Sequence, residues 1–185
     1  MAERIVITAM GICSALGDNL EEHLMGLLSG QSGLSVVENV STLHRDHIRV
    51  GELKHTNDFL AQQLGLPVVN HYSRTGLLGI WALKEAIAQA GLTPSEVAQL
   101  SMVMASSVGG MDMTERYFYA YTTQEALRRY IPYHNIGEVT GQIADYFGIK
   151  GYVTSVSTAC SSSANAILTA ANLLRTGRAQ RIAVG

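Results

Sequence analysis

The spacing of apolar and polar positions changes along the chain. Short apolar runs, which predict strands, alternate with segments of helical spacing, which predict helices. Short β-branched or apolar runs predict buried strands at Arg4–Thr8, Ser101–Ser106 and Tyr152–Ser157, and a further strand begins at Arg181. Longer segments with apolar residues three or four positions apart predict helices between these strands. The alternation of strand and helix is typical of an α/β layered fold with a largely buried sheet.

Capping residues and glycines indicate where the predicted helices begin and end. The expected helices are Leu20–Ser29, Arg74–Ala90, Pro94–Leu100, Ile136–Phe147 and Ser161–Arg175. Asp18 or Asn19 is the expected N-cap of the first helix and Ser73 that of the second, and glycine follows most of the helices. Residues 31–57 are expected to form short strands and loops, with one strand near Ile48–Leu53. Residues 111–129 are expected to form helix and loop.

Composition narrows the class of protein. The 185 residues include 13 Lys+Arg and 15 Asp+Glu, with a formal net charge of -2 and 47% hydrophobic residues. These values exclude a disordered chain, and the lack of a basic excess gives no support to nucleic-acid binding. No run of 18 apolar residues occurs, so no membrane-spanning helix is expected. Two cysteines, Cys13 and Cys160, are too few for a secreted disulfide scaffold and favour a reducing, cytoplasmic setting.

Cys160 has the surroundings that most favour chemistry. A β-branched strand ends just before it, and a helix of small residues begins directly after it. A thiol at a helix N-terminus meets the positive end of the helix dipole and unpaired backbone N–H groups. These groups favour the thiolate and can hold an oxyanion on an attached acyl group. The same pattern also fits a buried cysteine beside a tightly packed helix, so the residues alone leave both interpretations open. For Cys13, which lies in a glycine-containing turn, the packing interpretation is favoured.

The segment Thr158–Ser162 resembles the nucleophile motif of β-ketoacyl-[acyl-carrier-protein] synthases, the elongating ketosynthases of type II fatty acid and polyketide synthesis. Further segments resemble landmarks of this family in the same order, namely Arg4–Gly11, Leu28–Gly33, Ser73–Arg74, Ser106–Gly110 and Gly141–Gly151. The resemblance covers residues 1–185 and implies the N-terminal half of a thiolase-like α/β/α/β/α fold. The C-terminal half of that fold is then expected to be absent from this chain.

The resemblance implies an acyltransferase that performs a decarboxylative Claisen condensation with a malonyl unit. Cys160 would accept an acyl chain from the phosphopantetheine arm of an acyl carrier protein, and its N–H would be one oxyanion donor. Val108, Gly109 and Gly110 would bind substrate beside the acyl pocket. No cofactor or metal is implied beyond the phosphopantetheine arm on which the substrates are carried.

The resemblance also implies partners. Members of the family form dimers through the strand before the cysteine, so Tyr152–Ser157 is expected near a two-fold axis, with Ile131–Ile136 reaching the neighbour's pocket. The partner is either a second copy or a different ketosynthase-like subunit. Leu66–Tyr72 lacks the Lys and Arg with which the family often meets an acidic carrier protein. Arg74 is the one cation close to this segment. The alternatives for docking are Arg45, Arg49 and Lys54, or a partner subunit; Arg128 and Arg129 are a further candidate, for which a solvated helix end is the favoured interpretation.

Two alternatives to an elongating ketosynthase remain open, and the positions of the histidines bear on the first of them. The family's catalytic histidines belong to the second half, and none of the six His residues here lies in a matching motif. Acylation of Cys160 without condensation is therefore expected of this chain alone. One alternative is a non-condensing subunit of the chain-length-factor type, although that group typically lacks the cysteine. The other is a thiolase or starter-unit ketosynthase, but the context of Cys160 and the pair Gly109–Gly110 favours the elongating group.

Overall fold

The computed structural model describes residues 4–185, which divide into two compact units. The first unit comprises residues 4–7, 69–80 and 91–185. The second comprises residues 8–68 and 81–90. Helix α3, Arg74–Ala90, begins in the first unit and ends in the second. Each unit has buried apolar residues of its own.

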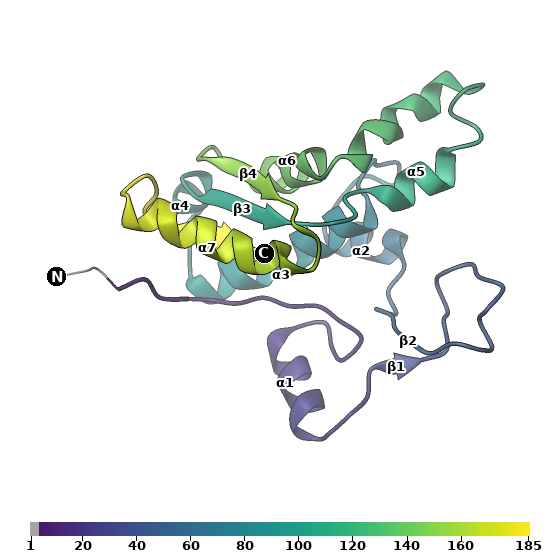
Figure 1. Cartoon of the computed structure of the whole chain (residues 1–185), viewed down its shortest axis with the longest axis horizontal. Helices are drawn as coiled ribbons and strands as arrows, with labels where there is room; N and C mark the ends of the chain where they lie inside the picture. Colours follow the sequence, from purple (N-terminus) through teal and green to yellow (C-terminus); the bar gives the residue numbers. More distant parts are fainter. Residues whose placement is uncertain (1–3) are drawn as a thin grey trace. The chain divides into compact units, whose positions relative to one another are not determined.

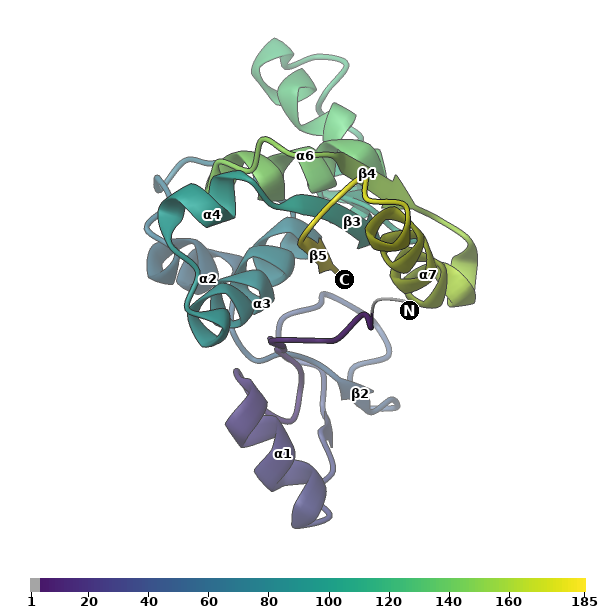
Figure 2. The same ribbon diagram turned by 90° about the vertical axis from the view of Figure 1, so that its left-hand side faces the viewer.

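A three-stranded parallel sheet forms the centre of the first unit (Figures 1 and 2). Strand β3 (Ser101–Ala105) lies between β4 (Val153–Val156) and β5 (Ile182–Val184). Ala105 is in register with Val156, so β3 and β4 end at the same edge of the sheet. The loops that follow these neighbouring parallel strands therefore start at the carboxyl end of the sheet, where α/β proteins commonly place their ligand sites.

Helices cover both faces of the sheet. On one face, α7 (Ser162–Arg175) packs Ala166 and Ala170 against Val103. Successive residues of a strand point to opposite faces, so Met104 lies on the other face, next to the position of Gly79 in α3. Figures 1 and 2 show α6 (Ile136–Phe147) on the side of the sheet opposite α7. These helix–sheet–helix layers confirm the α/β class predicted from the sequence.

Short helices complete the first unit. They are α4 (Pro94–Ala98), α5 (Met111–Tyr117) and the 3-10 helix η1 (Glu125–His134). A capping box between Thr93 and Glu96 begins α4, which ends at Ala98, two residues before the predicted end. Helices α5 and η1 pack against each other, and the rings of Tyr117 and Tyr130 stack with centroids 4.4 Å apart.

The strand predicted at Arg4–Thr8 is wrong. These residues form no strand, and the exposed fractions of Ile5, Val6 and Ile7 are 39%, 68% and 79%. A β-branched run favours extended backbone, but a strand exists only where a neighbour completes its hydrogen-bond ladder. No strand of residues 4–185 pairs with this segment.

The second unit contains less regular structure. Its elements are α1 (Leu20–Leu28), β1 (Leu34–Ser35), β2 (Val50–Gly51) and α2 (Asn57–Gln63). β1 and β2 pair antiparallel, and β2 lies within the predicted strand near Ile48–Leu53. Helix α2 has no counterpart among the predicted helices, although Thr56 caps it by accepting a hydrogen bond from the N–H of Phe59. Its seven residues are too few to show a helical period.

A buried carboxylate, Glu52, organises the second unit. Its carboxylate accepts backbone N–H hydrogen bonds from Glu38 at 2.8 Å, Asn39 at 3.0 Å and Val40 at 3.2 Å. Burial raises the pKa of Glu52, but these three N–H groups, together with the ammonium of Lys54, outweigh burial and lower the pKa below its ordinary 4.5.

The second unit is therefore expected to lose stability in acid. A carboxylate with a lowered folded pKa stabilises the fold fully above its unfolded pKa, and this contribution disappears as the pH falls through the folded pKa. Glu52→Gln should lower the free energy of unfolding by about 1.5–3 kcal/mol at pH 7. It should also reduce the dependence of stability on pH below 4.5. Urea unfolding followed by the fluorescence of Trp81 measures both effects.

Glu38 offers the matched control, because it forms an exposed ion pair with Lys54 at 2.8 Å. Glu38→Gln should change the free energy of unfolding by less than about 1 kcal/mol. A Glu52→Gln protein with the same acid profile as the unmodified chain would show that the carboxylate does not carry this pH dependence.

Candidate functional site

Cys160 lies where β4 passes into α7. The chain leaves β4 at Val156, and the short 3-10 helix η2 (Ala159–Ser161) leads directly into α7. The side chain of Cys160 is exposed, whereas Cys13 is half-buried. Within the described residues Cys160 is therefore not a buried packing residue.

The backbone turns sharply at Ala159, directly before the cysteine. Ala159 has a φ of 53°, and it is the one non-glycine residue with a positive φ in the part of the chain that the structure describes. For a residue with a Cβ this conformation costs about 1–2 kcal/mol. Strain of this kind persists where the surrounding contacts over-determine the backbone, and such places are enriched in functional sites.

Side-chain hydrogen bonds hold this turn. The buried Oγ of Ser162 accepts from the N–H of Thr158 at 2.9 Å and donates to the carbonyl of Ala159 at 2.7 Å. Asn165 Nδ2 donates to Thr158 Oγ1 at 2.8 Å, and Ser161 Oγ donates to the carbonyl of Thr158 at 2.8 Å. The first turn of α7 thus fixes the segment that carries the thiol.

The amide N–H of Cys160 is available to a ligand. Among residues 4–185 it donates to no acceptor. The N–H groups at a helix start carry the positive end of the helix dipole. They suit an oxyanion that forms on a carbonyl carbon bonded to the sulfur. An exposed thiol and an unpaired N–H on one residue can therefore support covalent acyl transfer.

The glycine turn Ser106–Gly110 follows β3 and leaves the sheet at the same edge as the Cys160 turn. The N–H of Ser106 donates to the carbonyl of Val156 at 3.4 Å, which joins the two turns at their bases. Ser106 Oγ accepts from the N–H groups of Val108 at 3.2 Å and Gly109 at 2.9 Å. The structure thus brings this turn to the end of the sheet where the thiol lies.

Gly109 and Gly110 also have a packing reason to lack side chains. A Cβ at Gly109, where φ is 55°, would lie 2.3 Å from the carbonyl oxygen of His134. A Cβ at Gly110 would lie 2.2 Å from that of Tyr133, which accepts the Gly110 N–H at 2.9 Å. The end of η1 therefore occupies the space that side chains would need. Val108, at 50% exposure, is the member of the turn that offers an apolar side chain.

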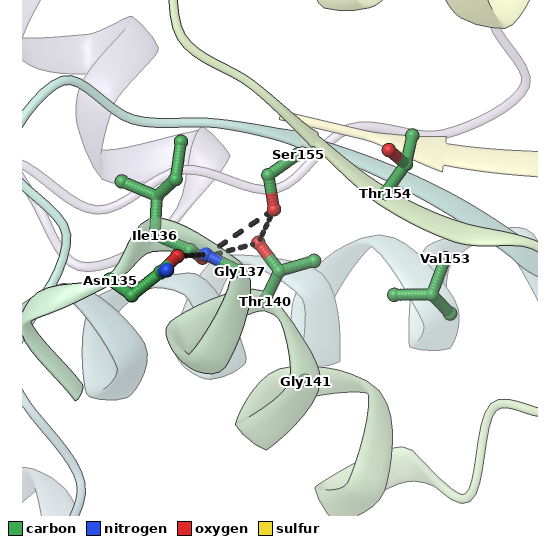
Figure 3. A pocket seen from close by; sticks show the side chains of 8 residues that line it. All are labelled: Asn135, Ile136, Gly137, Thr140, Gly141, Val153, Thr154 and Ser155. Atoms are coloured by element: carbon green, nitrogen blue, oxygen red, sulfur yellow. Dashed lines mark hydrogen bonds between the residues drawn. The ribbon is translucent and has the colours of Figure 1, made fainter. Parts of the chain in front are cut away.

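A groove of about 420 Å³ lies between β4 and the start of α6 (Figure 3). Its lining residues are Asn135, Ile136, Gly137, Thr140, Gly141, Val153, Thr154 and Ser155. Ser155 Oγ donates to Thr140 Oγ1 at 2.7 Å, and Thr140 Oγ1 donates to the carbonyl of Ile136 at 3.0 Å. These two hydroxyls are thus engaged with the protein. The groove borders β4, which is an edge strand of the described sheet.

Two features of the site were not predicted from the sequence. They are the strained backbone of Ala159 and the bonds by which Ser162 holds it. The small residues around Cys160 indicate close backbone packing there, but no residue pattern specifies a positive φ at an alanine. Over residues 4–185, no group of three or more His, Cys, Asp or Glu side chains is placed to hold a metal ion. In the same residues no helix has the length and apolar character to cross a membrane.

Comparison with known proteins bears on the whole chain. The model of the family described as "Beta-ketoacyl synthase, N-terminal domain" matches residues 2–185. The 3-oxoacyl-[acyl-carrier-protein] synthase 2 of Vibrio harveyi is 26% identical over 189 residues, which cover 98% of this chain and 45% of that protein. The chain thus spans about half the length of the known relatives it matches.

Solved structures show the same fold. One, titled the ishigamide ketosynthase/chain length factor, matches with a TM-score of 0.74 and 22% identity over 94% of this chain and 44% of that one. A ketosynthase in complex with its chain length factor, from Xenorhabdus doucetiae, matches with a TM-score of 0.68 and 23% identity over 97% and 45% of the two chains. The α/β layers described above are therefore those of the ketosynthase fold.

Proposed function

The chain belongs to the β-ketoacyl synthase family, as its N-terminal domain, and we propose that Cys160 is the nucleophile of a β-ketoacyl-[acyl-carrier-protein] synthase. The observation that carries this proposal is the exposed thiol on a strained, hydrogen-bonded turn at the start of α7. The names of the relatives, 3-oxoacyl-[acyl-carrier-protein] synthases, support the same activity.

The first step of the proposed reaction is acyl transfer to sulfur. The Cys160 thiolate attacks the carbonyl carbon of an acyl thioester on the phosphopantetheine arm of an acyl carrier protein. A new C–S bond forms, the old C–S bond breaks, and the departing thiolate takes up the proton that the Cys160 thiol released. The N–H of Cys160 stabilises the oxyanion of the tetrahedral intermediate. Val108, Gly109 and Gly110 border the acyl chain.

The second step is condensation, in which a malonyl thioester loses CO₂ and its carbanion attacks the Cys160 thioester. A C–C bond forms, and the Cys160 thiolate leaves. In the family this step uses histidines of the second half, and the chain spans about half of its relatives. The proposal therefore assigns acylation to the residues described here, whereas condensation requires histidines of the kind that the family carries in its second half.

A ketosynthase-like partner subunit is part of the proposal. β4 is an edge strand of the described sheet, and an edge strand with free N–H and C=O groups is a template for pairing with another chain. Dimerisation through β4, with an identical or a different subunit, follows from the family resemblance. The titles of two structural neighbours name a ketosynthase with its chain length factor, which supports a partner of this kind.

Those two titles also support the second candidate function, a non-condensing subunit that shapes the pocket of a catalytic partner. The presence of Cys160 on an accessible turn counts against this candidate, because that group typically lacks the cysteine. Acylation separates the two functions, since a non-condensing subunit needs no acyl-enzyme.

Acylation is tested by incubating the chain with an acyl-carrier-protein thioester and measuring intact and peptide masses. The expected result is one acyl group per chain, located on the peptide that contains Cys160. Cys160→Ala should lower the yield of labelled protein at least a hundredfold, because its side chain has no nucleophile.

Cys13→Ser is the matched control, because Cys13 is the other cysteine of the chain and lies in the second unit. The Cys13→Ser variant should be acylated at Cys160 at the rate of the unmodified chain. A folded chain that takes up no acyl group, or one labelled equally at both cysteines, would refute the proposed nucleophile.

A further inference from the structure

The side chain of Asn165 joins the residues on the two sides of Cys160. Its Nδ2 donates to Thr158 Oγ1 at 2.8 Å and to Ser161 Oγ at 3.3 Å. Thr158 lies two residues before Cys160, and Ser161 lies directly after it. These two hydrogen bonds are called the Asn165 bridge from here on. The bridge connects the chain just before the thiol with the chain just after it.

The donors and acceptors of the Asn165 bridge match in number. A carboxamide nitrogen carries two N–H donors, whereas a serine hydroxyl carries one proton. The proton of Ser161 is directed at Thr158, whose carbonyl oxygen lies 2.8 Å and whose Oγ1 lies 3.1 Å from Ser161 Oγ. Ser161 Oγ therefore has lone pairs but no proton to offer Asn165. A carboxylate in place of the amide lacks the donor that this second bond requires.

The backbone of Asn165 belongs to a firmly packed helix. The next residue, Ala166, is fully buried against Val103 of β3, and Ala170 packs there one turn later. Close packing of this kind allows little movement of a helix on its sheet. The bridge therefore fixes the exposed turn that carries the thiol relative to α7 and the sheet.

The Asn165 bridge acts at the surface, unlike the bonds of Ser162. Ser162 is buried and binds backbone groups of Thr158 and Ala159, whereas Asn165 binds exposed side chains. A surface hydrogen bond that breaks is replaced by bonds to water, so it adds little to the free energy of unfolding. Alanine is also a better helix former than asparagine. Loss of the bridge should therefore leave the fold intact and alter the orientation of the turn.

We propose that Asn165 is a positioning residue for the acylation of Cys160. The inference rests on the proposed function, because it gives Asn165 a part in that same reaction. Asn165 acts through Thr158 and Ser161 rather than on the substrate. The bridge holds the thiol and the N–H of Cys160 in the one orientation that serves both attack and oxyanion binding. A misplacement of about 1 Å in such an arrangement can lower a rate by about a hundredfold.

The test compares Asn165→Ala with the unmodified 185-residue chain in time-resolved mass measurements of acylation by an acyl-carrier-protein thioester. The rate at saturating thioester should fall about tenfold, because the bridge orients the reacting groups. The thioester concentration at half the maximal rate should change less than about twofold, because substrate binding is unaltered. The urea concentration at the unfolding midpoint should not fall. Asn172→Ala, the same change on an exposed residue two turns along α7, should be acylated normally.

Variants of Thr158 show whether Asn165 acts through the bridge. Thr158→Val preserves the shape of the side chain but removes Oγ1, and it should lower the acylation rate as Asn165→Ala does. Thr158→Ser retains the hydroxyl and should preserve the rate. The double variant Thr158→Val with Asn165→Ala should be less than about twofold slower than the slower single variant, because both changes break the same bond. Independent, multiplying losses would show that Asn165 does not act through Thr158.

Alkylation by iodoacetamide separates failure of this inference from failure of the proposed function, because it reports on the thiol without acyl transfer. Asn165→Ala should be alkylated at Cys160 at the rate of the unmodified chain. An unmodified chain that is alkylated but takes up no acyl group would refute the proposed nucleophile and this inference with it. Normal acylation of Asn165→Ala, beside an acylated unmodified chain, overturns this inference alone. Equal losses of acylation, alkylation and stability would assign Asn165 a purely structural role, which overturns it as well.

Discussion

Gly109→Ala is expected to lower the free energy of unfolding by about 2–5 kcal/mol and to reduce the acylation of Cys160. The positive φ of 55° at this position costs a residue with a Cβ about 1–2 kcal/mol. The new methyl would also lie 2.3 Å from the carbonyl oxygen of His134, so the backbone must move. Overpacking of this kind costs typically about 1–3 kcal/mol more. Urea unfolding of the variant and of the unmodified chain gives the difference.

Gly148→Ala separates the backbone strain from the overpacking as causes of the lost stability. Gly148 ends α6 with a φ of 66°, close to that of Gly109, but nothing lies within 4 Å of the place of its Cβ. This substitution should therefore cost about 1–2 kcal/mol, the backbone strain alone. Equal costs at the two positions would mean that η1 does not need the space beside Gly109, and the packing explanation of the glycine turn would fail.

The elements predicted most accurately from the sequence are those whose ends are marked by nearby residues. Helix α3 begins at Arg74 and ends at Ala90, as predicted, because Ser73 Oγ accepts the N–H of Gly76 and Gly91 follows. Helix α6 likewise ends at Phe147, as predicted, because Gly148 directly after it adopts the left-handed conformation that stops the helix. Caps and stops act within one turn of helix, so the sequence displays them directly.

The predictions that failed depend on residues far away in the chain. The β-branched run at Arg4–Thr8 has the composition of a strand, but a strand also requires a neighbour, and composition does not show whether one is present. By contrast, the strand predicted at Ser101–Ser106 is present as the central strand β3, because β4 and β5 pair with it on either side. Pairing is a property of the fold rather than of the segment.

The candidate site likewise has some features that are local in sequence and others that depend on distant residues. The sequence predicts Cys160 as the candidate nucleophile, because the strand before it and the small residues after it are local features. The sequence predicts a glycine turn at Gly109 and Gly110 but not the packing that requires glycine there. The backbone of η1 that approaches these two residues lies more than twenty residues later in the sequence.

Ala159→Val is expected to lower the rate of Cys160 acylation at least tenfold, whereas Ala159→Gly should preserve it. At a φ of 53° a β-branched side chain is a strong outlier, while glycine adopts this conformation without strain. With valine the turn should relax towards negative φ, which breaks the bonds of Ser162 to Thr158 N–H and to the carbonyl of residue 159. The thiol and its N–H then lose their common orientation, and a loss of about 1.4 kcal/mol in the transition state corresponds to tenfold in rate.

Time-resolved intact mass measurements with an acyl-carrier-protein thioester give the rate for each variant, and urea unfolding gives its stability. Ala126→Val is the control, since Ala126 is an exposed residue of η1 with negative φ, and it should be acylated normally. The glycine variant distinguishes strain from fold: it should unfold at the same or higher urea concentration than the unmodified chain, because it removes the strain of about 1–2 kcal/mol at this position. If the folded valine variant is acylated as fast as the glycine variant, the geometry of the turn does not activate Cys160, and the nucleophile needs only its exposure.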